Sequence, residues 1–201
     1  YLLMCDNLLD PTHVAWVHAG SFGQAATKSA PLRVKKTNDG VIVHRWMMDV
    51  EPAPFYKKVV GFNGNCDRLQ HYEVRYPSNA LIKAIFTPAG TGGSEGKLHD
   101  DVFIMDSYNF MTPVTESKTR YYWFQLRNIR PDDSELSQLM TDDVQQAFEE
   151  DRNVLNEVQK GMTNKTSPHI DLPIDAGQLR FRRQLQAMIN EEEQVDKQMA
   201  Q

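Results

Sequence analysis

Strand-like runs of apolar and polar residues occupy the middle of the chain, from Leu32 to Ile129. The first two runs flank Asn38-Asp39-Gly40, a strong hairpin-turn signal. The expected strands are Leu32–Lys36, Val41–Asp49, Leu69–Tyr76, Ala80–Thr87, Asp101–Met111 and Thr119–Leu126. Because clusters of Pro, Gly and Asn separate these runs, the pattern predicts a largely antiparallel sheet.

The pattern changes to a helical period after the last strand. Apolar residues recur near every 3.6 positions over Pro131–Gln159, which predicts a long helix that Asp133 or Ser134 could cap. A second helix is expected over Arg180–Glu193, behind a Pro168–Asp175 linker. A sheet followed by a long helix favours an α+β domain in which the helix lies across the sheet.

The N-terminal segment contains a helix-start signal, Asp10-Pro11, because Asp can cap free amides and Pro suits the first helical position. We expect a short helix over Pro11–His18, ended by Gly20 and Gly23. The apolar opening, Tyr1–Cys5, is strand-like. Since the chain begins within this run rather than at Met, we expect it to be a fragment of a longer polypeptide.

Composition narrows the class of protein. The 201 residues, 40% hydrophobic and 24% charged, fit one globular domain with a sizeable core. A net charge of -5 argues against a nucleic-acid or membrane-surface binder, and no apolar run approaches the roughly 20 residues of a membrane helix. Cys5 and Cys66 belong to no CxxC or CxH unit, so neither a disulfide framework nor a cysteine metal site is expected. We expect a cytoplasmic protein.

Metal-binding residue types gather in the apolar N-terminal segment, where Asp10, His13 and His18 lie close together. Burying such groups without partners costs several kcal/mol, so the cluster favours a metal site. Residues five apart on an ideal helix point about 140° away from each other. The histidines therefore converge only if the helix is bent or bulged, or if they lean together from its flanks. The alternative is a capped helix with one core and one surface histidine.

A third ligand is available on the long predicted helix. Glu149, Glu150 and Asp151 could form a solvated charged face, the usual role of such a run. Asp151, however, lies four residues from both Ala147 and Leu155 on the apolar face, so it points inward and its neighbours largely outward. An inward carboxylate requires a cationic partner.

Together these segments resemble the catalytic domain of the Rieske non-haem iron oxygenases, in particular the oxygenase component of vanillate O-demethylase and similar aromatic monooxygenases. The motif is Asn7-x-x-Asp10-x-x-His13-x-x-x-x-His18, followed far downstream by Glu150-Asp151. Supporting similarity occurs at Thr112–Glu116, Tyr121–Trp123, Asp151–Gln159 and Leu179–Arg183. The resemblance extends from Asn7 to about Ile189.

The resemblance implies site residues. It makes His13, His18 and Asp151 the iron ligands, and it places Asn7 near the iron, behind these ligands. Asp10 matches the position that bridges to the cluster-ligating histidine of a neighbouring subunit.

The resemblance also implies a substrate-binding position. Asn109 occupies the place of a histidine that contacts the substrate in several demethylases, so the substrate stays open. We therefore expect an α+β, helix-grip (START-like) domain, in which a curved antiparallel sheet and the long C-terminal helix enclose an apolar cavity with iron at one end.

The activity implied is that of a terminal oxygenase component. Mononuclear iron(II) and dioxygen would hydroxylate or O-demethylate an aromatic substrate such as a vanillate-like methoxybenzoate. Electrons would come from NAD(P)H through a reductase or ferredoxin and a Rieske [2Fe–2S] cluster, held by a neighbouring subunit in a homotrimer. Residues 1–201 lack the Cys-x-His and Cys-x-x-His pairs of that cluster, so they are expected to be the catalytic domain, with the Rieske domain N-terminal to them.

Two alternatives come from other classes: a metal-free helix-grip module that binds a small molecule, and a zinc hydrolase that uses the same three residues. Metal analysis separates iron, zinc and no metal. Of the other histidines, His44 and His71 are expected to be ordinary strand residues and His99 and His169 to be exposed, so no role is assigned to them.

Overall fold

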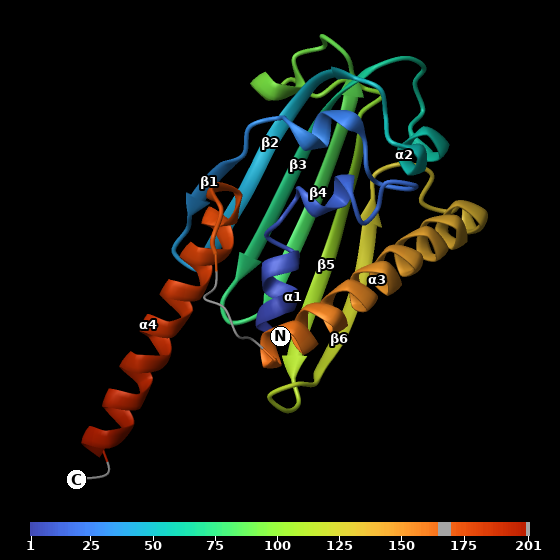
Figure 1. Cartoon of the computed structure of the whole chain (residues 1–201). Coiled ribbons are helices and arrows are strands. Elements are labelled where there is room, and N and C mark those ends of the chain that lie inside the picture. The colour runs from blue at the N-terminus through green and yellow to red at the C-terminus, as the bar shows by residue number, and fades with distance from the viewer. Residues whose placement is uncertain (165–169, 200–201) are drawn as a thin grey trace.

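The computed structural model describes residues 1–164 and 170–199, which contain the expected antiparallel sheet (Figure 1). Its six strands lie in chain order, each antiparallel to the next. They are β1 Arg33–Lys36, β2 Gly40–Val50, β3 Cys66–Arg75, β4 Asn79–Pro88, β5 Phe103–Pro113 and β6 Thr119–Arg127. The predicted α+β fold is confirmed, and so is the hairpin at Asn38-Asp39-Gly40, where Lys36 pairs with Val41.

Two long helices follow the sheet, as expected. Helix α3, Ser134–Thr163, lies along the β5–β6 side of the sheet, and α4, Ala176–Met199, lies beside β1 and β2 and projects away from the domain (Figure 1). Asp133 caps α3, because its carboxylate accepts a hydrogen bond of 2.8 Å from the amide of Leu136. A short helix, α1, Leu2–Asn7, lies between α3 and α4 and contacts both.

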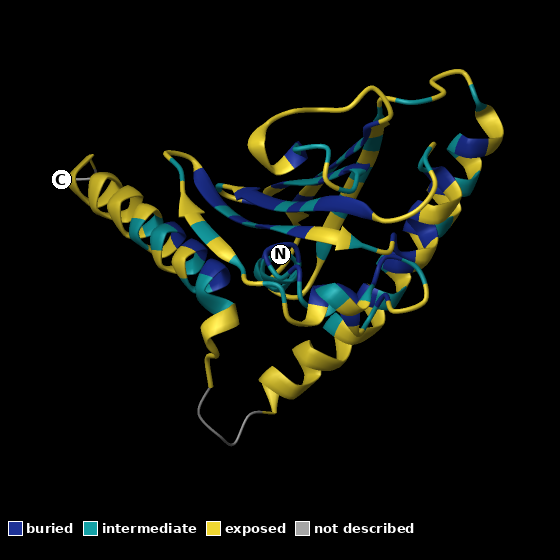
Figure 2. Ribbon diagram, turned by 90° about the horizontal axis from the view of Figure 1, so that it is seen from above, coloured by how far each residue is buried: buried dark blue, intermediate teal, exposed yellow. Residues whose placement is uncertain are grey.

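One face of the sheet is covered by these helices and carries the core in two parts (Figure 2). The first core joins the sheet to α3 and to α2, Pro54–Val59; it includes Phe55, Phe86, Phe103, Met140 and Val144. The second core joins the sheet to α1 and α4; it includes Leu9, Val43, Val74, Met111 and Phe181. Side chains alternate between the two faces of a strand, so every second residue of β2 to β5 points to the helix-covered side of the sheet.

Two N-terminal predictions are wrong. The run Tyr1–Cys5 is not a strand but belongs to α1, Leu2–Asn7; a short apolar run does not by itself distinguish the two structures. The helix expected over Pro11–His18 is reduced to one 3₁₀ turn, His13–Ala15. Instead of capping an α-helix, the Asp10 carboxylate accepts a hydrogen bond from the amide of Thr12, 2.7 Å away, and so holds a tight turn.

Several smaller features complete the fold. Helix α2, which begins at Pro54, was not predicted, and further 3₁₀ turns cover Ala25–Lys28, Gly93–Glu95 and Pro173–Asp175. The first residues of the expected linker Pro168–Asp175 lie outside the described residues. His169 also lies outside them. Cys5 and Cys66 are buried free thiols. Across residues 1–164 and 170–199, no helix has the length and apolar character needed to cross a lipid bilayer.

Candidate metal centre and adjoining cavity

His13, His18 and Asp151 come together although 133 residues separate the second histidine from the aspartate. Oδ1 of Asp151, on α3, lies 3.1 Å from Nε2 of His18 and 3.6 Å from Nε2 of His13. One potential ligand atom from each residue lies within 4.8 Å of the others. The sequence motif and the inward carboxylate therefore form one cluster, as the three-ligand hypothesis requires.

The histidines converge because their segment is not an α-helix. After the 3₁₀ turn His13–Ala15, the chain turns again, and the amide of Gly23 donates a 2.9 Å hydrogen bond to the carbonyl of His18. A side chain at Gly23 would place its Cβ 2.6 Å from the carbonyl oxygen of Val14, so this turn requires glycine. The tight turns remove the divergence of about 140° that a regular helix would impose.

The outward-facing nitrogen of each imidazole is held by a fixed acceptor. Nδ1 of His18 lies 2.7 Å from Oε2 of Glu150, and Nδ1 of His13 contacts the backbone carbonyl of Asp10. Oε1 of Glu150 in turn accepts a 3.3 Å hydrogen bond from Gln146. Histidines that ligate metals are commonly oriented by such acceptors. In this arrangement the two Nε2 atoms are left to face Asp151.

Glu150 was not assigned this contact from the sequence. The helical period placed it largely outward, yet its side chain is only 33% exposed and reaches back to His18, whereas Glu149 is exposed and pairs with Arg152 at 2.6 Å. The signal that could have found it is chemical rather than periodic, because a ligating histidine needs an acceptor for its second nitrogen.

The electrostatics of the cluster fit a divalent metal. Asp151 is 8% exposed, and apart from Nε2 of His18 its Oδ1 has no hydrogen-bond partner within the described part of the chain. Burial lowers the pKa of His13 against the opposing charges of Asp151 and Asp10. Burial also acts to lower the pKa of His18, but the hydrogen bonds and charges of Asp151 and Glu150 outweigh it, and this pKa is raised. Two imidazoles and a carboxylate suit iron(II) or zinc.

Two buried arginines attach the loop that carries His13 and His18 to the sheet. Arg45 of β2 donates hydrogen bonds to the carbonyls of Pro11 and Ala30, at 3.1 and 3.0 Å, and Arg68 of β3 donates to the carbonyl of Phe22 at 3.2 Å. Both guanidinium groups are almost fully buried. The sequence analysis did not identify them. They satisfy backbone carbonyls that a non-helical loop leaves without partners.

An open cavity of about 910 Å³ adjoins the cluster, with Asp151 in its wall. Helices α1 and α3, strand β6 and the turn before β6 surround it. Its aromatic wall consists of Tyr121, Trp123 and Phe148, with ring centroids 5.2 Å apart between Phe148 and each of the others. A pocket in which aromatic side chains lie beside polar groups is a common form of a small-molecule site.

The other residues predicted from the sequence lie at different distances from the cavity. Asn7 lines it. The Asp10 carboxylate is partly exposed, with Oδ2 3.9 Å from Nδ1 of His13. Asn109 is 1% exposed and does not belong to the cavity wall. Its Oδ1 accepts a 2.7 Å hydrogen bond from the hydroxyl of Tyr121, a residue that does line the cavity.

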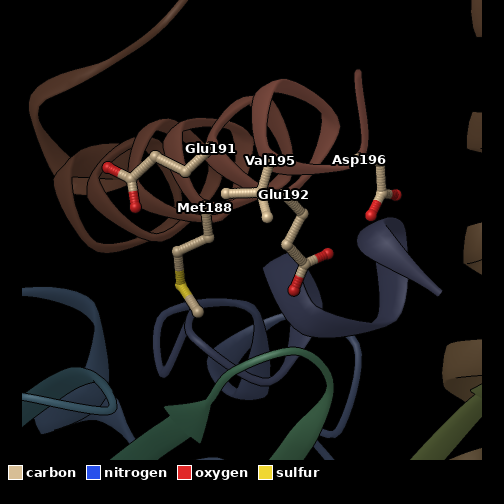
Figure 3. Close-up of a pocket in the computed structure, with 5 residues that line it drawn as sticks. All are labelled: Met188, Glu191, Glu192, Val195 and Asp196. Carbon is tan, nitrogen blue, oxygen red and sulfur yellow. The ribbon is translucent and has the colours of Figure 1, made fainter. Parts of the chain in front are cut away.

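A second hollow, of about 330 Å³, lies on the projecting part of α4 (Figure 3). It is lined by Met188, Glu191, Glu192, Val195 and Asp196. These side chains come from one helix, all of them are exposed, and they include neither histidine nor cysteine. The cavity beside Asp151 is therefore the better candidate site.

The chain is similar to known proteins in sequence. Residues 1–191 match the family described as the vanillate O-demethylase oxygenase C-terminal domain. A vanillate O-demethylase oxygenase subunit from Pseudomonas sp. (strain ATCC 19151) is 31% identical over 99% of this chain and 62% of that protein. The toluene-4-sulfonate monooxygenase system iron-sulfur subunit TsaM1 of Comamonas testosteroni is 31% identical over 88% of this chain and 52% of that protein. The chain thus spans little more than half the length of these relatives.

The fold is also found among solved structures. Dicamba monooxygenase bound to 3,6 dichlorosalicylic acid superposes with a TM-score of 0.84 at 21% sequence identity, over 96% of this chain and 56% of that one. At this identity the likeness establishes the fold. It agrees with the antiparallel sheet and long helix described above.

Proposed function

Because the chain belongs to the vanillate O-demethylase oxygenase C-terminal domain family, we propose that it is the catalytic part of a terminal oxygenase that oxidises an aromatic substrate with iron and dioxygen. The observation that carries this proposal is the convergence of His13, His18 and Asp151 beside an aromatic cavity. Iron(II) held by two histidines and one carboxylate supplies dioxygen activation, since such a ligand set leaves coordination positions open.

The chain's own residues hold and orient the reactants. Asp10 and Glu150 fix the imidazoles, while Asn7 and Asp151 lie among the polar residues of the cavity wall. The rings of Trp123 and Phe148 provide an apolar surface against which an aromatic substrate would pack. The substrate would thereby be kept beside Asp151, the proposed metal ligand in the cavity wall.

The names of the relatives support an aromatic substrate such as a vanillate-like methoxybenzoate. In an O-demethylation, insertion of one oxygen atom into a methyl C–H bond yields a hemiacetal that releases formaldehyde and leaves a phenol. The second oxygen atom, two electrons and two protons form water. Because the hemiacetal collapses by itself, this reaction needs no separate hydrolytic residue.

The electrons are proposed to reach the site from a Rieske [2Fe–2S] cluster, supplied by NAD(P)H through a reductase or ferredoxin. The name "iron-sulfur subunit" in the toluene-4-sulfonate systems supports such a cluster. Cys5 and Cys66 form no Rieske ligand pair, so the cluster would be held outside these 201 residues. We propose that a neighbouring subunit of a homotrimer presents it to the partly exposed Asp10.

Metal analysis and product analysis test the function together. The full-length protein is reconstituted without oxygen with iron(II) or zinc(II), and then given reductase, NADH, dioxygen and vanillate as the probe. One iron per chain with formaldehyde release supports the oxygenase. Activity with zinc and no reductant would indicate a hydrolase, and failure to bind either metal would favour a metal-free binding module.

The electron route has its own test, in the variant Asp10→Asn. Asparagine keeps an acceptor oxygen for the amide of Thr12, so we expect iron content near that of the wild type. Steady-state turnover driven by the reductase should fall at least tenfold, while one turnover of protein with both iron centres chemically reduced beforehand is retained. If both rates match the wild type, Asp10 only stabilises the turn.

A further inference from the structure

The hydroxyl of Tyr121 belongs to a hydrogen-bond chain whose direction is fixed by the fold. Tyr121 lies on the helix-covered face of β6 and lines the cavity together with Asp151. Its hydroxyl is 2.7 Å from Oδ1 of Asn109, and Nδ2 of Asn109 is 3.0 Å from the backbone carbonyl of Ser107. The chain thus runs from a strand carbonyl inside the sheet to the cavity.

A carbonyl oxygen can only accept a hydrogen bond, so Ser107 must face the amide nitrogen of Asn109. The amide oxygen of Asn109 then faces Tyr121, and because that oxygen also only accepts, the phenol must be the donor. The orientation of Asn109 therefore follows from the backbone. The single proton of the Tyr121 hydroxyl is therefore used in the hydrogen bond to the buried Asn109.

A phenol whose only proton is donated in a hydrogen bond to one partner offers only lone pairs to another. Burial, followed by the charges of Asp151 and Cys5, raises the pKa of Tyr121 far above its usual value, so the group stays neutral and keeps its proton. The hydroxyl of Tyr121 therefore has lone pairs, and no proton, to offer to a molecule in the cavity that this residue lines.

We propose that Tyr121 determines substrate specificity by selecting aromatic molecules that carry a hydrogen-bond donor, such as a phenolic hydroxyl, and that Asn109 acts as the positioning residue that sets this preference. The inference rests on the proposed function, because it names the substrate class of the same cavity. An aromatic ring packed on Trp123 and Phe148 would bring a ring hydroxyl to Tyr121. The ring would then lie beside Asp151, which belongs both to the cavity wall and to the candidate metal site. A ring with only ether oxygens there would place two acceptors against each other.

The test measures binding of two probes, 4-hydroxy-3-methoxybenzoate and 3,4-dimethoxybenzoate, to the full-length protein by calorimetry. The wild type should bind the hydroxyl-bearing probe at least about fivefold more tightly, the usual effect of one neutral hydrogen bond. Tyr121→Phe keeps the ring and removes the acceptor, so the ratio of the two affinities should fall to about one. Tyr122→Phe, on the exposed opposite face of the same strand, is the matched control and should keep the ratio.

Asn109→Leu provides a second, independent variant. It removes the acceptor that holds the Tyr121 proton, so Tyr121 becomes free to donate, and the preference should vanish or turn toward the dimethoxy probe. An unchanged ratio in Tyr121→Phe would overturn the proposal. So would a wild-type ratio near one, or the absence of binding of both probes at millimolar concentration.

Binding is measured without reductant or dioxygen, which separates this inference from the oxygenase proposal. Protein that binds no iron but shows the predicted ratios would refute the oxygenase and retain the role of Tyr121. If the protein demethylates vanillate but the ratio of the two probe affinities is the same in the wild type and in Tyr121→Phe, the oxygenase proposal is retained and the role of Tyr121 is refuted.

Discussion

Glu150 offers a quantitative test of how the metal centre is supported. Its Oε2 accepts from Nδ1 of His18 at 2.7 Å, and its side chain is 33% exposed. A hydrogen bond to a charged group is worth about 1.5–3 kcal/mol, and partial exposure places this one near the lower end. A loss of about 1.4 kcal/mol is tenfold in affinity, and comparable supporting residues of metal sites account for about 10–100-fold. We therefore expect Glu150→Leu to raise the Kd for the metal about tenfold.

The assay is competition of iron(II) between the protein and a chelator of known affinity, without oxygen. Glu149→Leu is the control, because Glu149 lies one residue earlier on α3 but is exposed and contacts Arg152. Glu150→Gln keeps an acceptor oxygen without the charge and should show an intermediate Kd. If Glu150→Leu and Glu149→Leu have Kd values within twofold of each other, while both variants unfold at the wild-type temperature, the orienting role of Glu150 is refuted.

Four further predictions concern the candidate site and the loop that carries its histidines. Asp151→Ala should lose stoichiometric iron while keeping the wild-type circular dichroism spectrum; iron that stays bound, measured by elemental analysis, removes Asp151 from the ligand set. Arg45→Met should lower the free energy of unfolding in urea by about 3 kcal/mol, because it leaves loop carbonyls without donors, and a loss below about 1 kcal/mol would show that the loop is held otherwise. Because the raised pKa of His18 makes a proton compete with the metal, dialysis at decreasing pH should release metal from above about pH 6.5, and retention down to pH 5 would contradict this. In the metal-free protein the same raised pKa should add stability that is fully present below about pH 6.5 and lost as pH rises through the folded-state pKa.

The local pattern of apolar and polar residues was sufficient to predict most of the strands and helices. The strands and the long helix were predicted within a few residues, because each buries one face and its period is written in consecutive positions. The inward position of Asp151 followed from the same periodicity. Patterning failed where no period exists. The run Tyr1–Cys5 is apolar throughout, so only its packing between α3 and α4 decides that it belongs to a helix.

The sequence by itself determined which residues are able to bind a metal: two imidazoles in one motif and a carboxylate on the buried face of a helix. Only the tertiary structure decided how they meet. Histidines five positions apart diverge on a regular helix, and they converge here because tight turns around Gly23 replace it, held to the sheet by the buried Arg45. The acceptor for His18 comes from Glu150, 132 residues away. Contacts at such separations depend on how whole elements pack, and no local propensity along the chain encodes them.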